Sequence, residues 1–124
     1  VIVQEEEAYL LPGLTDLESF SEQYTTRSGI RLIWTPGPTP GSCCAYAPSP
    51  WNVLFCGRLL IPVGFNRINS VRQRTTFHWT RQRKSLEKLR NWIPSNSSPS
   101  LASGADLQLL EDKKLVDWAG WQHD

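Results

Sequence analysis

The chain of 124 residues has no methionine, only three cysteines and two histidines, and no long apolar run. Its longest apolar stretches, VLFC and LLIPVGF, fall far short of the roughly 20 residues that a membrane-spanning helix needs. An odd number of cysteines excludes a complete disulfide framework and favours a reducing compartment, so we expect a cytoplasmic protein. No charged and then apolar signal segment opens the chain. The absence of methionine indicates a processed or trimmed start, and we expect residues to have preceded Val1.

Charge is distributed unevenly along the chain, although the formal net charge is only +1. Residues 1–57 carry six acidic and two basic side chains, and residues 58–90 carry nine basic and one acidic. Residues 91–124 carry two basic and five acidic side chains. A basic band therefore lies between acidic flanks. Such a band can bind phosphate, a carboxylate-rich partner or the acidic flanks of the same chain, and the pattern leaves these alternatives open.

The first third of the sequence predicts a strand, a helix and a second strand. Residues 1–3 (VIV) read as a short buried strand, and residues 30–34 (IRLIW) alternate as a strand does. Between them, residues 15–29 predict a helix that Thr15 caps and Gly29 ends. Three apolar side chains would share one face of this helix: Leu17, Phe20 and Tyr24.

The remainder predicts a hairpin and two further helices. Residues 43–47 (CCAYA) and 51–56 (WNVLFC) read as strands joined by a proline-stiffened loop. After GRLLIPVGF we expect an irregular polar stretch to about residue 80. Residues 81–92 predict a helix with Leu86, Leu89 and Ile93 inward and its basic residues mostly outside, and residues 105–118 predict a helix capped by Asp106. The chain is therefore expected to be a single α/β domain over residues 1–124, a mixed β-sheet with helices on one face.

Two motifs at a defined separation give this order of elements a family resemblance. TPGPTPGS at residues 35–42 is followed by VLFCGRLL at residues 53–60, and the helix SLEKLRNW comes later. The arrangement resembles the C-terminal half of the metallo-β-lactamase-fold hydrolases, over roughly residues 30–106. The resemblance implies half of a β-sandwich, because the N-terminal half with its HxHxDH ligand motif is absent from this sequence.

At the metal-ligand positions of that family, this chain carries other residues. The histidine of the family's TPGHTPGS motif is replaced by Pro38, which has no side-chain lone pair. The aspartate that commonly bridges two metals is replaced by Arg58, whose guanidinium offers only donors. The last histidine ligand corresponds to Ala105, with Asp106 beside it as a carboxylate that could bind in principle. The resemblance therefore implies neither a bound metal nor another cofactor, and no catalytic residue.

The motif scaffold itself is retained, since its glycines allow tight turns and its prolines fix φ. Its residues are Thr35, Pro36, Gly37, Thr39, Pro40, Gly41, Ser42 and Gly57. Such a scaffold without ligands predicts a catalytically inactive protein that acts as a binding or assembly module. The arginines available for an anion or a partner are Arg58, Arg67, Arg72, Arg74, Arg81 and Arg83.

Two alternatives to this function stay open. One is a metal-dependent hydrolase of the metallo-β-lactamase superfamily that takes ligands from elsewhere. The other is a nucleic-acid-binding module that uses the basic band 58–90, with Phe77 and Trp79 available for stacking. We expect the partner to be another protein subunit or a second copy of the chain, with nucleic acid a weaker candidate, and no membrane span.

Smaller features have structural interpretations that we favour. Cys43 and Cys44 are adjacent on one strand and point to opposite faces, so at most one of them can lie beside Cys56. Buried thiols would then behave as small apolar groups. His78 lacks a neighbouring nucleophile or carboxylate, and the tail pair Trp118 and Trp121 is expected to fold back onto the domain.

Overall fold

The structure is a computed structural model that describes residues 2–8, 10, 13, 16–70, 78–94, 97–104 and 115–121. Its first elements are β1 (Ile2–Gln4), α1 (Glu5–Ala8), β2 (Glu18–Phe20), β3 (Gln23–Thr25) and β4 (Arg31–Trp34). These are followed by β5 (Cys43–Ala47), β6 (Val53–Gly57), β7 (Leu60–Gly64) and β8 (Arg67–Ser70). The last are α2 (Trp79–Trp92), β9 (Ser100–Ser103) and a 3-10 turn, η3 (Trp118–Gly120).

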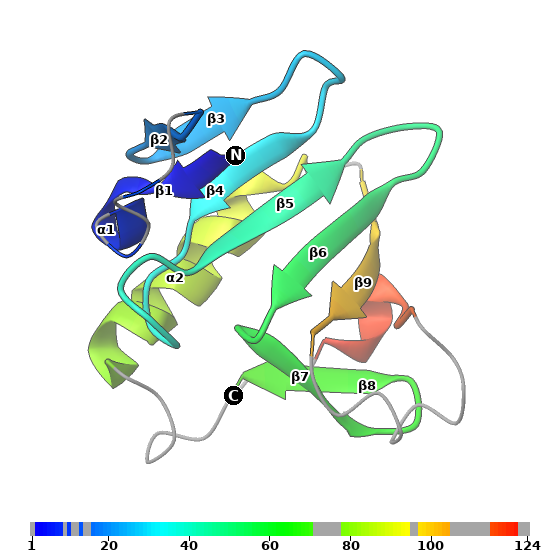
Figure 1. Ribbon diagram of the computed structural model, residues 1–124. Helices are drawn as coiled ribbons and strands as arrows, with labels where there is room; N and C mark the ends of the chain where they lie inside the picture. The colour runs from blue at the N-terminus through cyan, green and yellow to red at the C-terminus, as the bar shows by residue number, and fades with distance from the viewer. Residues whose placement is uncertain are drawn as a thin grey trace.

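The centre of the molecule is a five-stranded sheet with the order β3-β4-β5-β6-β9 (Figure 1). The neighbours from β3 to β6 are antiparallel, whereas β6 and β9 run parallel. Two smaller sheets flank it, the parallel pair β1-β2 and the antiparallel hairpin β7-β8. The sheet is therefore mixed, as the sequence predicts.

The core lies between the central sheet and α2, which runs behind it in Figure 1. Ile33, Cys44 and Leu54 point inward from three neighbouring strands and are at most 1% exposed. Leu89 and Ile93 meet them from α2. Leu86 packs partly buried against the same cluster, so the predicted inward face of this helix is confirmed.

Three of the expected strands are confirmed: the strand expected at residues 30–34 by β4, the one at 43–47 by β5 and the one at 51–56 by β6. The helix expected at residues 81–92 is confirmed by α2. The β5-β6 hairpin is also confirmed by its antiparallel register. No described helix is both long and apolar enough to cross a membrane.

The helix expected over residues 15–29 is wrong. In its place lie β2, whose backbone pairs with β1, and β3, whose backbone pairs with β4. Phe20 and Tyr24 still meet, with ring centroids 6.1 Å apart, but they do so from two strands instead of one helical face. Partner strands outside the segment satisfy its backbone groups, and this tertiary pairing outweighs a weak local helix preference.

The irregular stretch expected after residue 65 is also wrong in part, because β8 begins at Arg67. Asn66 turns the chain with a φ of 52°, and Ile68 is then fully buried opposite Pro62. Most of the helix expected over residues 105–118 lies outside the described residues. Its described end is not α-helical, since Val116 forms a bridge to Leu101 and Trp118 begins η3.

Candidate functional site at one end of the central sheet

Pro38 and Arg58 stand at positions where the family that the sequence resembles carries metal ligands. Both lie at the same end of the central sheet. In the register, Trp34 at the end of β4 pairs with Cys43 at the start of β5, and Gly57 at the end of β6 pairs with Ser103 at the end of β9. The loop with Pro38 leaves β4 at this end, and Arg58 follows Gly57 there. The chain toward Ala105 also leaves β9 here, although Ala105 and Asp106 lie outside the described residues.

The loop of residues 35–42 is closed by its own hydrogen bonds. The Thr35 N–H donates to the Ser42 carbonyl at 2.8 Å, so the two ends of the motif are tied together. Within the loop, the N–H groups of Gly37 and Ser42 both donate to the Thr39 carbonyl at 3.3 Å. The Trp34 indole N–H also donates to the Pro40 carbonyl at 2.7 Å. Pro38 lies in this loop, where its missing N–H leaves none of these bonds unmade.

The first turns of α2 fix the same loop from behind. The Ser85 hydroxyl, which is buried, donates to the Pro36 carbonyl at 2.7 Å. The N–H of His78 donates to the Gly37 carbonyl at 3.0 Å, and the His78 Nδ1 accepts from the Arg81 N–H at 3.2 Å. His78 is therefore the N-cap of α2, which supports the structural interpretation of this histidine.

Gly37 has a specific reason to be glycine. Its φ is +152°, and a Cβ at this position would overlap the backbone and side chain of Gln82, which is fully buried on α2. The close approach of loop and helix thus depends on the absence of a side chain at residue 37. Sequence reasoning missed Gln82 and Ser85 as loop supports. The available signal is that they precede the inward Leu86 and Leu89 on the same side of the helix.

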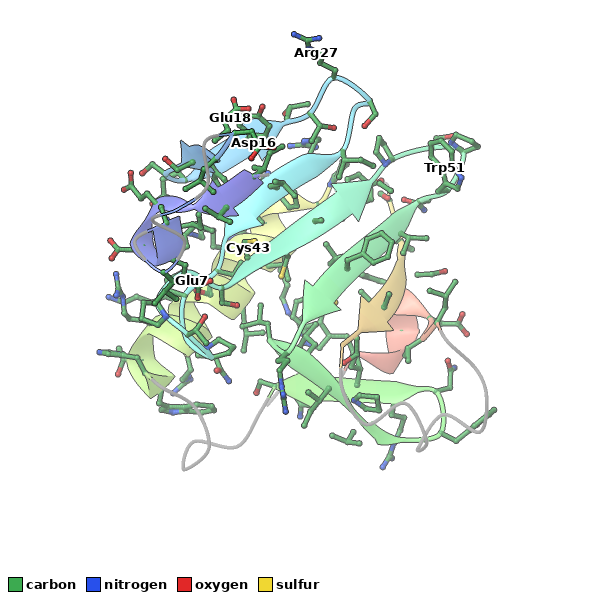
Figure 2. All side chains as sticks on the ribbon, viewed as in Figure 1. Glu7, Asp16, Glu18, Arg27, Cys43 and Trp51 are labelled. Atoms are coloured by element: carbon green, nitrogen blue, oxygen red, sulfur yellow. The ribbon has the colours of Figure 1, made fainter. Side chains whose placement is uncertain are left out.

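A carboxylate that sequence reasoning also missed lies on the loop. Glu7 of α1 accepts a hydrogen bond from the Thr39 hydroxyl at 2.6 Å, and its side chain occupies the space where a Cβ on Gly41 would project. Figure 2 shows Glu7 beside the loop and Cys43 at the start of β5. Burial, and then the nearby Glu7 charge, raise the pKa of the Cys43 thiol. Residue 7 is 32 positions away in sequence, so no local pattern could have indicated this contact.

The turn after β6 is held by β9. Gly57 has a φ of +55°, a conformation that favours glycine, and its carbonyl accepts the Gly104 N–H at 2.7 Å. The Ser103 hydroxyl donates to the Leu60 carbonyl at 2.8 Å. Arg58, the next residue, is exposed and forms no ion pair with any carboxylate in the described part of the chain. Its expected partner Asp106 lies outside that part.

The described residues at this sheet end do not suit a divalent metal. Zinc and related ions need several His, Cys or carboxylate donors on one centre. Pro38 offers no side-chain donor atom, Arg58 repels a cation, and Glu7 already accepts the Thr39 hydroxyl. Across residues 2–8, 10, 13, 16–70, 78–94, 97–104 and 115–121, no three His, Cys, Asp or Glu side chains gather in a way that could hold a metal.

The arginines of the basic band that the structure describes lie on different elements. The Arg81 guanidinium lies over the Trp34 ring, 5.2 Å from its centroid, and Lys88 lies over the same ring at 5.5 Å. Lys88 also pairs with Glu22 at 3.2 Å, so part of the band contacts an acidic flank of its own chain. Arg67 and Arg83 are exposed, on β8 and α2 respectively. Arg72 and Arg74 lie outside the described residues.

The thiols divide between the two faces of the sheet, as predicted. Cys44 and Cys56 are at most 1% exposed, and the Cys44 thiol donates to the Cys56 carbonyl at 3.8 Å. Burial raises the pKa of Cys44 to about 12, and it raises that of Cys56 well above its usual value. Such thiols stay protonated at neutral pH and are poor nucleophiles. All three cysteines are free, with Cys43 half-buried on the opposite face.

Comparisons with known proteins bear on the fold. No protein-family model matches the sequence, and no curated protein matches it. A solved structure does: an N-acyl homoserine lactone hydrolase, determined at 1.4 Å with the product N-hexanoyl-L-homoserine bound at its catalytic metal center. The two chains share a TM-score of 0.64 at 19% sequence identity, over 86% of this chain and 47% of the hydrolase chain.

This comparison supports the predicted resemblance at the level of the fold. The protein has a mixed α/β fold similar to the metallo-β-lactamase fold, with a mixed sheet and few helices. At 19% identity the likeness concerns the backbone arrangement alone. The chain spans about half the length of the hydrolase chain that it matches.

Proposed function

We propose that this chain is half of a metallo-β-lactamase-like sandwich, with helices on one face of its sheet, that acts as a binding or assembly module without catalysis. One observation carries the proposal. The end of the sheet keeps the hydrogen-bonded TPGPTPGS loop and the Gly57 turn, yet Pro38 and Arg58 stand where the family resemblance requires a histidine and an aspartate. The backbone of the loop and of the turn is retained, but the side chains of Pro38 and Arg58 supply no ligand for a metal.

Folding and catalysis place different demands on the residues at this end of the sheet. The loop is needed to connect β4 to β5 and to seat α2 through Ser85, so its backbone stays under structural constraint. Metal ligands serve only the chemistry, and a proline or an arginine in their place costs little folding free energy at a half-buried or exposed position. A protein that no longer needs the metal can therefore keep this fold and use its surface.

Metal content tests the proposal against a working hydrolase. The chain is purified without chelator, incubated with zinc, manganese and iron(II), dialysed and examined by elemental analysis. We expect far less than one metal ion per chain, because the described donors cannot complete a coordination shell. A stoichiometry near one or two would contradict the proposal and favour the hydrolase. A Pro38→Ala variant is the matched control, since it removes no donor and should leave the metal content unchanged.

Nucleic-acid binding is the second candidate, with α2 as its basic surface. Arg81 and Lys88 lie over the Trp34 ring, and Arg83 and Lys84 are further exposed cations of this helix. Binding by a few phosphate contacts would weaken steeply with added salt.

We place the protein in a reducing compartment such as the cytoplasm, in keeping with its three free cysteines.

A further inference from the structure

The face of the central sheet that points away from α2 carries a continuous row of apolar side chains. Residues directly opposite one another on the five strands form this row: Tyr24, Leu32, Ala45, Phe55 and Ala102. The alternation of each strand sets this face apart from the core, since Leu54 and Cys56 are fully buried whereas Phe55 between them is 50% exposed. We call this surface the open face.

The open face is not covered by the described residues at its centre. Strands β5 and β6 lie at the front of Figure 1, with α2 behind them. Leu32, Ala45 and Ala102 are only half-buried, and Cys43, which points to the same side, is half-buried too (Figure 2). The exposed Phe55 side chain stands beside the small side chains of Ala45 and Ala102, so the surface has a projecting ring next to two low positions. Contiguous apolar surface of this kind commonly marks a protein interface.

The two sides of the open face carry opposite charge. Glu7, Asp16 and Glu18 lie on the β1-β2 side (Figure 2), together with the exposed Glu5 and Glu6 of α1. The hairpin β7-β8 lies on the opposite side (Figure 1), and it carries Arg67 while Arg58 leads into it. One carboxylate also lies there, since Asp117 accepts a hydrogen bond from the Asn66 side chain at the β7-β8 turn at 3.2 Å. The open face is thus bordered by acidic residues on one side and, on the other, by two arginines with one aspartate beside them.

We infer that a second copy of this chain docks on the open face. A two-fold axis that lies in the interface and runs along the strands exchanges the two sides of the face. Each acidic β1-β2 side then lies against the arginines of the partner's β7-β8 side, which makes the surface electrostatically self-complementary. With the axis between β5 and β6, Phe55 of each copy lies over the small Ala45 of the other. Two sheets packed in this way are nearly aligned, which is a common sheet-on-sheet arrangement.

This inference deepens the proposed function, since it names the partner of the assembly module. It is tested on the whole 124-residue chain by light scattering and sedimentation between 1 and 200 µM at low and high salt. We expect twice the mass of one chain at the upper concentrations. The dissociation constant should rise with salt, because the charged sides of the interface are screened.

A Phe55→Ser variant tests the face itself, and Phe65→Ser is its matched control. Phe65 is 60% exposed at the β7-β8 turn, away from the row. Because central aromatic residues dominate interfaces, Phe55→Ser should raise the dissociation constant by about 30-fold or more, whereas Phe65→Ser should leave it nearly unchanged. Circular dichroism verifies that both variants keep the fold, which is expected because both side chains are at least half exposed.

A monomer at every concentration overturns the inference, as does a dimer that both variants weaken equally or that Phe55→Ser leaves intact. A monomer that binds a different polypeptide through Phe55 also overturns it, but leaves the proposed assembly function standing. A stoichiometric metal in the chain, in contrast, contradicts the proposed function whether or not the chain dimerises. The two failures are therefore distinguishable.

Discussion

At the end of the central sheet, the chemistry of the Pro38 and Arg58 side chains does not depend on what surrounds them. A proline has no side-chain donor atom and an arginine has no lone pair in any fold, so the sequence alone predicts that neither Pro38 nor Arg58 supplies a metal ligand. The contact of Glu7 with Thr39 and the burial of Gln82 against Gly37 could not be predicted in this way. Both depend on which surfaces the completed fold brings together.

Gly37→Ala is expected to destabilise the protein by roughly 2–4 kcal/mol, since it adds a Cβ at a φ of +152° and against the buried Gln82. Urea denaturation followed by tryptophan fluorescence measures the change. Gly13→Ala is the matched control, because a Cβ at Gly13 would meet nothing within 4 Å. Equal effects at the two positions would contradict the close packing of loop and helix.

The pH dependence of stability should report the buried thiols. Cys44 has a pKa of about 12 in the folded protein against an ordinary value of 9.0, because burial disfavours its thiolate. The Cys44 thiol therefore keeps its proton to a higher pH in the folded state than in the unfolded state. Its contribution to stability is complete below pH 9. That contribution is lost as pH rises from 9 toward 12, at about 1.4 kcal/mol per pH unit.

Urea denaturation at several values between pH 8 and pH 11 measures this loss. We expect Cys44→Ala to have a shallower decline than the wild-type chain above pH 9. Cys43→Ala is the comparison variant, because its thiol is only half-buried. A decline that Cys44→Ala leaves unchanged would show that other groups cause it.

At the scale of elements, the sequence predicted what local periodicity specifies. The strands β4, β5 and β6 and the helix α2 each carry their own apolar pattern, and they form as expected. In contrast, the segment that contains β2 and β3 has a helix-like spacing of Leu17, Phe20 and Tyr24, and β8 is short and mostly polar. These three strands exist because β1, β4 and β7 offer backbone partners, which no single-segment pattern reveals.

The attachment of α2 to the loop can be tested at Ser85. Ser85→Ala removes the buried hydrogen bond to the Pro36 carbonyl, and we expect a loss of roughly 1–2 kcal/mol in the free energy of unfolding. Ser98→Ala, at an exposed position, should change it by less than about 0.5 kcal/mol. Chemical denaturation of the two variants side by side decides whether the helix is seated through this contact.

At the scale of the whole molecule, the sequence predicted a half sandwich and a tail that folds back. The tail prediction is confirmed, since Trp121 is 5% exposed, bridges to Ile68 and lies under the Arg90 guanidinium at 3.9 Å. Trp118 meets it edge-on at 5.4 Å. The half sandwich remains a proposal. A resemblance in motifs specifies the local backbone, whereas the pairing that we propose for the open face involves surfaces that no local pattern specifies.

Trp121→Ala should destabilise the protein by about 3–5 kcal/mol, because a buried indole leaves a cavity beside Ile68. Trp51→Ala is the matched control. Trp51 is 67% exposed at the β5-β6 turn, so its removal should cost less than about 0.5 kcal/mol. Thermal unfolding of both variants measures the difference, and similar melting temperatures would show that the tail does not close the core.

The parallel pairing of β6 with β9 has a consequence for how the chain folds. Val53 and Ser100 lie side by side in the sheet although 47 positions separate them, and α2 lies between them in sequence. The entropy lost in closing so long a loop is recovered only after the strands meet. The antiparallel strands β3 to β6 can pair through short turns before that. Until β9 pairs with it, β6 has one unpaired edge and carries the exposed Phe55. We expect the chain to be most prone to aggregation during this interval.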